Sequence, residues 1–287
     1  MTVGQAAAGR YRISWPAALA RPAQPPLITL LTDFGAEDAY AGTMKGVIAA
    51  LAPRARVIDI THGIPPQDVV AGGLRWSAAA PFFPRGTIHV AVVDPGVGGE
   101  REILAVRAGA AFFLAPDNGL IGFVDDRFGV EEAVWVRRKQ LFLPRVSRTF
   151  HGRDILAPVA ARLSLGLPLR SLGPPARSFV PSPLPAVHKT RTREGIRLEG
   201  VIVDVDNFGN CITNISSGEQ GAGKLCDVRV GKWRFPSLRE SYSMVPSGKP
   251  LAIVGSTGFL EIAVNCGRAD RTLGLRRGRR VAAFLQP

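Results

Sequence analysis

The chain has 287 residues, of which 46% are hydrophobic and 21% are charged, a composition typical of one large or two modest globular domains. No apolar run is long enough to span a bilayer, which argues against a membrane protein or a membrane partner. The net charge of +13 would suit a nucleic-acid partner, but the basic residues are scattered or terminal and are not interleaved with stacking aromatic residues. We therefore expect no nucleic-acid partner and interpret the charge as compositional bias, which leaves an anionic cofactor open.

The cysteines and the N-terminal segment indicate the compartment. Cys211, Cys226 and Cys266 have no paired spacing, which argues against a disulfide framework and a zinc site and fits a reducing cytoplasm. Residues 1–26 are rich in Ala, Arg and Pro and lack the uninterrupted apolar core of a secretory signal. We interpret residues 1–26 as a disordered or misannotated extension and predict a cytoplasmic protein.

A regular α/β pattern begins at Leu27. The segment LITLL predicts a buried strand, residues 37–51 a helix, and RVIDI a second strand. Pro65 and Pro66 precede a second helix, and TIHVAVVD predicts a third strand that ends at Asp94 before the glycine-rich loop PGVGGE. This order of strands and helices predicts an α/β N-terminal domain over 27–172 with a mostly parallel central sheet.

The pattern changes after this loop. ILAVRAG, AFFLAPDNGLIGFV and EEAVWVRR predict three strands with turns and no long helix between them, and RTFHGRDILAPVAARLSLG returns to helix. Residues 173–196 are rich in Pro and Ser and predict a linker. Over 197–287, the segments LEGVIVDVD, CITNIS, KLCDVRVG, PLAIVGS, FLEIAVN and RRVAAFL predict a small all-β barrel or sandwich.

Two carboxylates follow predicted parallel strands. Asp33 and Asp94 both stand at carboxyl ends, the edge where ligands bind in open α/β sheets. A carboxylate at this edge can take ribose hydroxyls or a metal ion, and it can equally cap a helix. The loop VDPGVGG lacks the spacing of a dinucleotide or P-loop motif, which argues against phosphate binding.

Three residues can together activate a water molecule. Asp68 and Arg75 are seven residues apart, or two helical turns, so we expect both on one face of one helix. This spacing is too long for a direct intrahelical ion pair and favours a shared partner. His151 stands at a predicted start of a helix; if it folds onto that face, an acid, a guanidinium and an imidazole can polarise one water. Taken one by one, these residues have simpler interpretations. Asp68 and Arg75 can form a weak exposed pair, and His151 can be a packed or capping histidine.

The polar segment DVDNFGNCITN is unusual at a strand edge. Its residues form turns readily, which is the simplest interpretation. As a binding platform, Phe208 would stack on a flat ring while Asn210 bonds the edge of that ring.

Taken in order, LLTDFG, VIDITHGIPPQDVVAGG, VAVVDPGVGG, APDNGL, TFHGRD, VDNFGNCITNI and GSTGFLEIAVN resemble the SAM hydroxide adenosyltransferases, also called SAM hydrolases (adenosine-forming), which are relatives of fluorinase and chlorinase. The resemblance runs from about Leu27 to the C-terminus. It implies an N-terminal α/β domain, a C-terminal β-barrel and a homotrimer. S-adenosyl-L-methionine (SAM) would lie between the N-domain of one subunit and the C-domain of its neighbour, as substrate, with no cofactor and no metal.

The resemblance also implies roles for individual residues. Asp33 would hold the ribose hydroxyls and Asp94 would join the SAM-binding set, while Asp68, Arg75 and His151 would match the water-activating triad. In the C-terminal half, Asp206 would meet the methionine amino group and Ser256 would hold the amino-acid end. Phe208 and Tyr242 would face adenine. Asn210 and the backbone from Val264 to Cys266 would bond the adenine edge.

Departures from the halogenases favour hydrolysis. Their halide pocket uses a Tyr and a Thr at the positions of Asp94 and Val97, and a Ser at that of Gly152. A carboxylate there would repel a halide. The fluorinase Trp before the helical acid is Gln67 here, and its Arg after the serine is Thr257, so the contacts of the methionine end differ.

We therefore predict attack of water or hydroxide on the 5′ carbon of SAM, giving adenosine and L-methionine. The alternatives are a chloride-using halogenase, a non-catalytic SAM- or adenosine-binding regulator, and a basic nucleic-acid binder. A metal-dependent phosphohydrolase is a further alternative, with Asp33, Asp94, Asp117 and His151 as its site.

Overall fold

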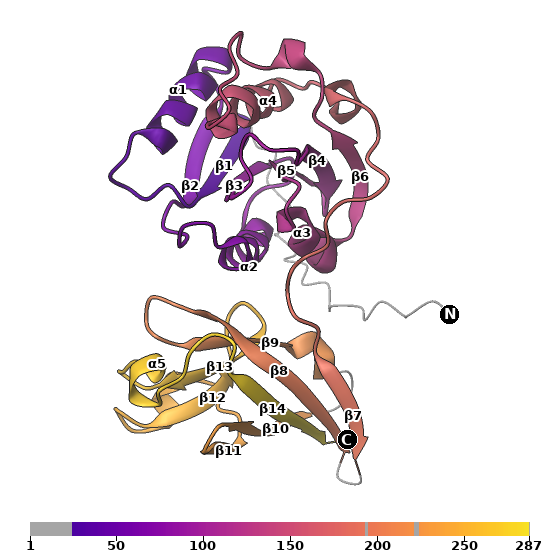
Figure 1. The fold of residues 1–287 in the computed structure, drawn as a ribbon. Helices are drawn as coiled ribbons and strands as arrows, with labels where there is room; N and C mark the ends of the chain where they lie inside the picture. The colour runs from indigo at the N-terminus through magenta and orange to yellow at the C-terminus, as the bar shows by residue number, and fades with distance from the viewer. Residues whose placement is uncertain (1–24, 193–194, 221–223, 287) are drawn as a thin grey trace, which may run out of the picture. The chain divides into compact units, whose positions relative to one another are not determined.

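The computed structural model describes residues 25–192, 195–220 and 224–286. The expected extension over 1–26 therefore lies almost wholly outside the described residues. The chain folds as two compact units that divide between Pro183 and Leu184 (Figure 1). No described helix is long and apolar enough to cross a membrane.

The N-terminal unit is built on a six-stranded sheet in the order β2-β1-β3-β5-β4-β6. The pairs β1–β2, β1–β3 and β3–β5 are parallel, and β4 runs against both of its neighbours. The prediction of a mostly parallel central sheet is thus confirmed. The strands are β1 (Leu27–Thr32), β2 (Arg56–Thr61), β3 (Ile88–Val92), β4 (Ile103–Ala108), β5 (Ala111–Pro116) and β6 (Val130–Trp135).

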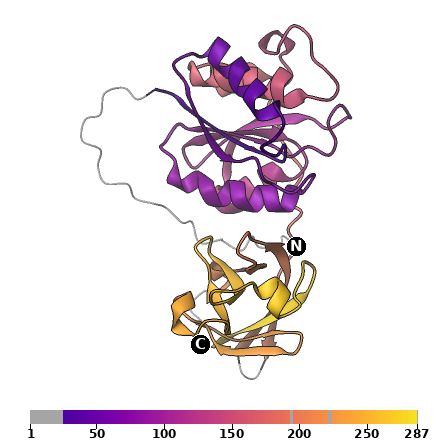
Figure 2. The same cartoon turned by 90° about the vertical axis from the view of Figure 1, so that its left-hand side faces the viewer.

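Helices cover both faces of this sheet (Figures 1 and 2). Ile28 and Leu30 of β1 belong to the core beneath α1 and α4, whereas Leu31 belongs to the core beneath α2 and α3. Because both faces are buried, the central strands read as continuous apolar runs rather than as alternating ones. The helices are α1 (Tyr40–Leu51), α2 (Val69–Ala79), α3 (Leu120–Phe128) and α4 (Ala157–Ser164), with the π-helical turn η3 (Gly152–Leu156) leading into α4 and the short 3₁₀ turns η1 (Ala80–Phe82), η2 (Lys139–Leu141) and η4 (Leu169–Leu172).

The helix α3 corrects the sequence prediction. Residues 111–124 were expected to form a strand with turns, yet residues 120–128 form a nine-residue helix that begins after Gly119 at φ +103°. Leu120, Ile121, Phe123 and Val124 are buried in it, the spacing of a helical stripe. The prediction failed because the run GLIGFV is apolar throughout, and so short a run does not separate helix from buried strand.

The C-terminal unit is all antiparallel, in the order β11-β10-β14-β8-β9-β13-β12 with β7 paired to β8. The two ends of this path meet where Arg239 bridges Ile253, so the sheet comes close to closing as a barrel. The elements are β7 (His188–Thr192), β8 (Gly195–Val205), β9 (Cys211–Ser216), η5 (Ser217–Gln220), β10 (Lys224–Val230), β11 (Trp233–Ser237), η6 (Tyr242–Met244), β12 (Pro250–Val254), β13 (Phe259–Val264), α5 (Ala269–Thr272) and β14 (Arg280–Gln286).

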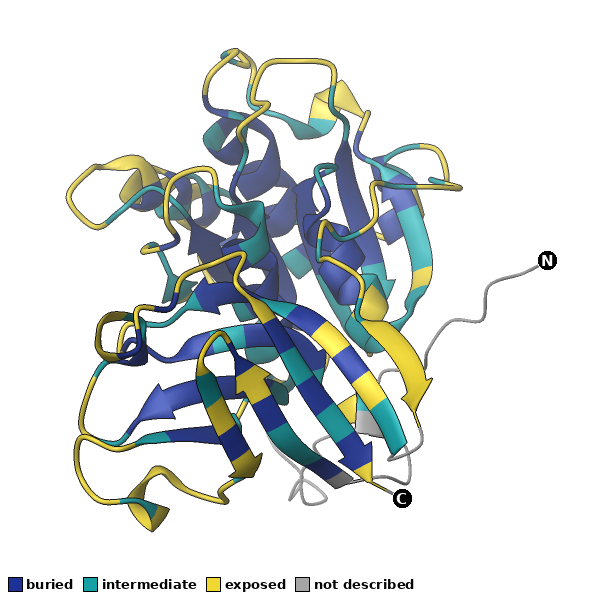
Figure 3. Cartoon of the chain, turned by 60° about the horizontal axis from the view of Figure 1, so that its bottom comes forward, coloured by how far each residue is buried: buried dark blue, intermediate teal, exposed yellow. Residues whose placement is uncertain are grey.

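All six strands expected in this unit are present, and along β8 buried and exposed residues alternate in part (Figure 3). The strands β7 and β11 were not predicted. β7 lies within the stretch expected to be a linker, and all five of its residues are exposed. Without a buried side, such a strand carries no alternating apolar pattern by which to recognise it.

The close packing of α2 on α3 gives the first prediction. A Cβ on Gly73 of α2 would overlap the ring of Phe123 on α3, whereas a Cβ on Gly46 of α1 meets nothing within 4 Å. We expect Gly73→Ala to lower the free energy of unfolding by about 1–3 kcal/mol and the matched control Gly46→Ala to raise it by up to about 1 kcal/mol. Urea unfolding measures both; equal effects of the two variants would contradict this packing.

A buried histidine gives a second prediction. His89 on β3 bonds Oγ1 of Thr29 at 2.8 Å, and burial lowers the pKa of His89 to about 3. In the unfolded chain this pKa is about 6.5, so the unfolded state binds a proton that the folded state excludes. Stability is therefore complete above about pH 6.5 and falls on acidification by up to about 1.4 kcal/mol per pH unit. Urea unfolding at pH 7 and pH 5 should give a smaller difference for His89→Gln than for the wild type; an equal difference would contradict this account.

Candidate active site

The two predicted edge carboxylates lie at neighbouring strand ends. Thr32 pairs with Val92 in the register of β1 and β3, so Asp33 and Asp94 leave the sheet at the same edge, as predicted. One oxygen of Asp33 accepts the backbone N–H of Gln67 at 2.7 Å. This hydrogen bond ties the approach to α2 to the end of β1.

Asp68 caps α2 instead of standing inside the helix. Its Oδ1 accepts the backbone N–H of Ala71 at 3.0 Å, the usual bond of an N-cap residue. Gln67 just before it has φ +64°, which prevents the helix from extending towards Pro66. Arg75 lies two turns further along α2. The helix expected to carry both residues is present, and Asp68 is its N-cap residue, directly before the first helical residue Val69.

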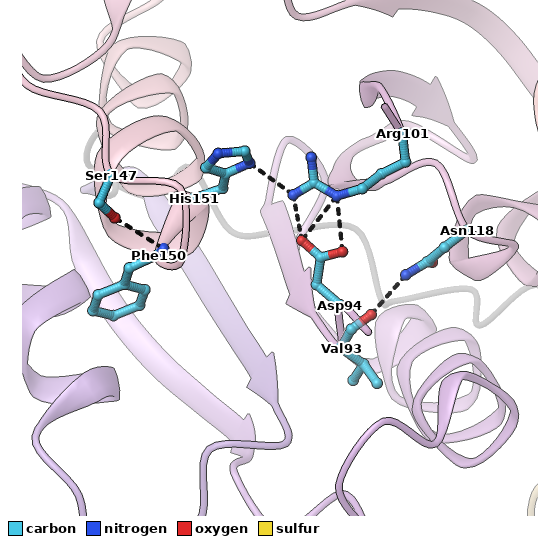
Figure 4. A network of polar contacts seen from close by, with 7 residues as sticks. All are labelled: Val93, Asp94, Arg101, Asn118, Ser147, Phe150 and His151. Atoms are coloured by element: carbon cyan, nitrogen blue, oxygen red, sulfur yellow. Dashed lines mark hydrogen bonds and ion pairs between the residues drawn. The ribbon is translucent and has the colours of Figure 1, made fainter. Parts of the chain in front are cut away.

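A buried ion pair dominates the centre of this edge. Nε of Arg101 donates to Oδ1 and Oδ2 of Asp94 at 2.9 and 3.1 Å, and Nη2 also donates to Oδ2 (Figure 4). The side chains are only 11% and 5% exposed. Such a two-point contact fixes orientation as well as charge. Arg101 was not predicted; a buried carboxylate at a strand end calls for a counter-ion, but the sequence does not say which Arg supplies it.

His151 joins this pair. Nη2 of Arg101 donates to Nδ1 of His151 at 2.7 Å (Figure 4). Burial and the positive charge of Arg101 lower the pKa of His151, against the opposing charges of Asp94 and Asp154. The imidazole is therefore neutral at pH 7. Asp94 and His151 thus meet through Arg101, a link that the sequence did not reveal.

The glycine-rich loop brings these groups together. Gly98 adopts φ +77°, and a Cβ there would collide with the carbonyl oxygen of Arg148. The loop can therefore pack directly against the chain that leads into His151. On the other side, Nδ2 of Asn118 donates to the carbonyl of Val93 at 2.7 Å and fixes the backbone before Asp94 (Figure 4).

Aromatic rings lie next to the polar groups in sequence. Phe34, Tyr40 and Phe150 pack against one another with centroids 5.1–5.6 Å apart. Phe34 directly follows Asp33 and Phe150 directly precedes His151. Tyr40 is 48% exposed, so this cluster presents apolar surface near the edge of the sheet.

Asp94 and Gly152 stand at the positions that the sequence analysis compared with a halide pocket. Asp94 is paired with Arg101, so its charge is largely balanced and the repulsion of a halide expected from the sequence is weakened. A Cβ at Gly152 would lie 3.1 Å from Sδ of Met44 and 3.4 Å from Cγ1 of Val92. A serine side chain at this position would therefore crowd Met44 and Val92.

In the C-terminal unit, the predicted platform is a closed turn. Oδ1 and Oδ2 of Asp206 accept the backbone N–H and Nδ2 of Asn210 at 2.8 and 2.9 Å. Phe208 at the tip is 74% exposed, as a stacking ring requires. The amide of Asn210 has committed one donor to Asp206 and keeps its oxygen for another partner.

A buried acid lies next to the other predicted ligands. Tyr242 donates to Oε2 of Glu261 at 3.1 Å, and burial raises the pKa of Tyr242 to about 12. Burial also raises the pKa of Glu261. Its carboxylate occupies the space that a Cβ on Gly255 would need, and Gly255 directly precedes Ser256. Glu261 was not predicted, although a lone Glu within the apolar run FLEIAV was a usable signal.

The remaining predicted ligands end the strand β13. Val264 is its last, buried residue, and Cys266 follows in an exposed turn at φ +53°. Because Ile262 pairs with Cys211, this strand end lies near the turn of Asp206 to Asn210. The predicted residues therefore form two groups, one in each unit.

Among the described residues, no three His, Cys, Asp or Glu side chains are arranged to hold a metal ion. Two of the carboxylates considered for a phosphohydrolase site, Asp94 and Asp117, also bind other groups of the chain. Asp94 holds Arg101, and Asp117 accepts the backbone N–H of Val180 at 2.8 Å.

The sequence matches the models of both domains of one known family. The N-terminal domain model of the SAM hydroxide adenosyltransferases matches residues 28–173, and the C-terminal domain model matches residues 200–282. The chain belongs to the SAM hydroxide adenosyltransferase family. Both polar groups described above lie within the matched ranges.

Several family relatives are similar over nearly their whole length. A Salinispora tropica protein named (R)-S-adenosyl-L-methionine hydrolase is 40% identical over 263 residues, 90% of this chain and 98% of that protein. A fluorinase of an Actinoplanes species is 27% identical over 288 residues, 88% of this chain and 95% of the fluorinase. The solved structure of an uncharacterised conserved protein of Thermotoga maritima has a TM-score of 0.80 and 35% identity, covering 90% of this chain and 99% of that chain.

The packing of the glycine loop gives a third prediction. Gly98 and Gly129 have similar φ values of +77° and +73°, but only Gly98 has a backbone oxygen in the place of a Cβ. We expect Gly98→Ala to push the loop and Arg101 away from His151 and so raise the His151 pKa. Gly129→Ala, the matched control, should cost only the left-handed backbone strain of about 1–2 kcal/mol. An NMR titration of His151 measures this; an unchanged pKa in Gly98→Ala would contradict the proposed contact.

Proposed function

We propose that this protein hydrolyses SAM to adenosine and L-methionine. The observation that carries the proposal is the partly buried Asp94–Arg101–His151 cluster at the carboxyl edge of the sheet, in a chain 40% identical to a protein named as an (R)-SAM hydrolase. That name supports the (R) sulfonium epimer as the preferred substrate.

The reaction is a direct displacement at the 5′ carbon. A water oxygen forms a bond to C5′ while the C5′–S bond breaks and its electron pair goes to sulfur, which neutralises the sulfonium. The water proton passes to a base and then to solvent, so one proton is released per turnover. The thioether leaves as a neutral group and needs no acid. The barrier lies in aligning and desolvating the nucleophile, and orientation can supply up to roughly 7–11 kcal/mol.

In the N-terminal unit, Asp33 would hold the ribose hydroxyls through the oxygen that Gln67 does not occupy. Asp68, Arg75 and His151 would surround the attacking water. Arg75 favours the hydroxide form because a positive charge lowers the pKa of a nearby acid. Asp94 would act next to SAM as the partner of Arg101.

In the C-terminal unit, Asp206 and Ser256 would hold the methionine end, and Phe208 and Tyr242 would face adenine. Asn210 and the backbone from Val264 to Cys266 would bond the adenine edge. The exposure of Phe208 supports a partner surface that completes its stacking.

We further propose a homotrimer in which the N-terminal domain of one subunit and the C-terminal domain of its neighbour share each SAM. The free cysteines Cys211, Cys226 and Cys266 support the cytoplasm as its compartment.

The direct test is chromatography after incubating the purified protein with each sulfonium epimer of SAM, with and without chloride or EDTA. We expect adenosine and methionine in equal amounts, unaffected by either additive, and faster from the (R) epimer. A chlorinated nucleoside would favour the halogenase, and intact SAM would favour a binding protein.

The roles of single residues give a fourth prediction. His151→Ala and Asp68→Ala should lower kcat by about 100-fold or more with little change in SAM affinity, because they act on the water. Asp33→Ala should mainly weaken binding, because it removes a ground-state contact. Steady-state kinetics and calorimetry with SAM separate the two effects. If all three variants changed only the affinity for SAM, the assignment of the triad would be wrong.

A further inference from the structure

We infer that Arg101 is a positioning residue that holds His151 as a neutral Nε2–H donor to the attacking water, so that the water proton leaves to a carboxylate and not to His151. This inference rests on the proposed function and deepens it. It also assigns a task to the residue that joins Asp94 to His151.

The hydrogen bond from Arg101 fixes which ring nitrogen of His151 carries the proton. Arg101 carries only N–H donors and no acceptor. Its Nη2 has two hydrogens; one goes to Asp94 and the other to Nδ1 of His151 at 2.7 Å. Nδ1 must therefore present its lone pair. A neutral imidazole has one N–H, so the ring proton lies on Nε2.

The same contact keeps the imidazole ring of His151 neutral. A proton on Nδ1 would point at the guanidinium N–H of Arg101, which the ion pair with Asp94 holds in place. The other charged groups that act on His151 are Asp94 and Asp154. Asp154 is already engaged by Arg153 at 2.6 Å and by the backbone N–H of Ser147 at 2.8 Å. The sulfonium of SAM would add a second cation, so the imidazolium is disfavoured twice.

A neutral His151 limits where the proton of the attacking water can go. With Nδ1 occupied and Nε2 protonated, neither ring nitrogen can accept a proton. Nε2–H can donate to the water oxygen, and such a donor stabilises the hydroxide form over neutral water. The proton must go to an acid in its carboxylate form. Of the residues proposed to surround the water, Asp68 is the only carboxylate, and it passes the proton to solvent.

Substitutions at His151 separate a donor from a base. The amide nitrogen of Gln can replace the Nε2–H donor but cannot take up a proton. We expect His151→Gln to retain kcat within about tenfold of the wild type, and His151→Ala to lose about 100-fold or more. If Gln and Ala lowered kcat equally, with both variants folded and binding SAM, His151 would be the base and the inference would be overturned.

The tautomer itself can be read without substrate. In ¹⁵N-histidine-labelled protein at pH 7, with His151→Gln used for assignment, we expect His151 to show a pyridine-type Nδ1 and a pyrrole-type Nε2. Arg101→Met should mix the tautomers, raise the His151 pKa and lower kcat without raising KM. Because Arg101→Met leaves Asp94 unpaired and can disturb folding, Arg101→Lys serves as a second variant that keeps a donor and should preserve the wild-type tautomer.

A wild-type protein with Nδ1–H or an imidazolium at pH 7 would overturn the inference, whatever its activity. A protein with the expected tautomer that leaves both SAM epimers intact would overturn the proposed function, and with it the role of His151 in a reaction. The two failures are thus distinguishable.

Discussion

The buried ion pair of Asp94 and Arg101 is the interaction on which the candidate site depends. A carboxylate with 5% exposure is costly to bury unless a cation and hydrogen bonds compensate for lost hydration. Arg101 supplies both, and the same guanidinium reaches His151. The pair therefore fixes the end of β3, the glycine loop and the start of η3 together. Removing either partner would leave the charge of the other unpaired. A substitution at Asp94 or Arg101 therefore changes the charge balance and the geometry of the site together.

The register of the sheet places the two edge carboxylates. The parallel register of β1 and β3 brings Asp33 and Asp94 to one edge of the sheet, and cores on both faces hold these strands. The segment that follows β5 is hydrogen-bonded back to this edge, where Asn118 donates to the carbonyl of Val93. Side chains carried on rigid strand ends keep their separations without help from a ligand, which suits a reaction limited by the alignment of its nucleophile.

Much of this arrangement could be predicted from the sequence. Strands that are buried on both faces, such as β1 and β3, are recognisable as apolar runs, and Asp33 and Asp94 lie within two residues of their ends. Other features could not be predicted. The exposed strand β7 has no buried side, and the apolar run of α3 is too short to separate a helix from a buried strand. Arg101 meets His151, fifty residues away, where the loop of Gly98 packs on Arg148; pairing at that distance depends on tertiary structure.

The central claim is that water, positioned at this edge, displaces methionine from the 5′ carbon of SAM. Running the reaction in H₂¹⁸O and locating the label by mass spectrometry tests it most directly. The account predicts one ¹⁸O atom in the 5′-hydroxyl of adenosine and none in methionine, because the new bond joins the water oxygen to C5′. Adenosine without ¹⁸O, or label in the methionine, would show that bond formation occurs elsewhere and would contradict the account.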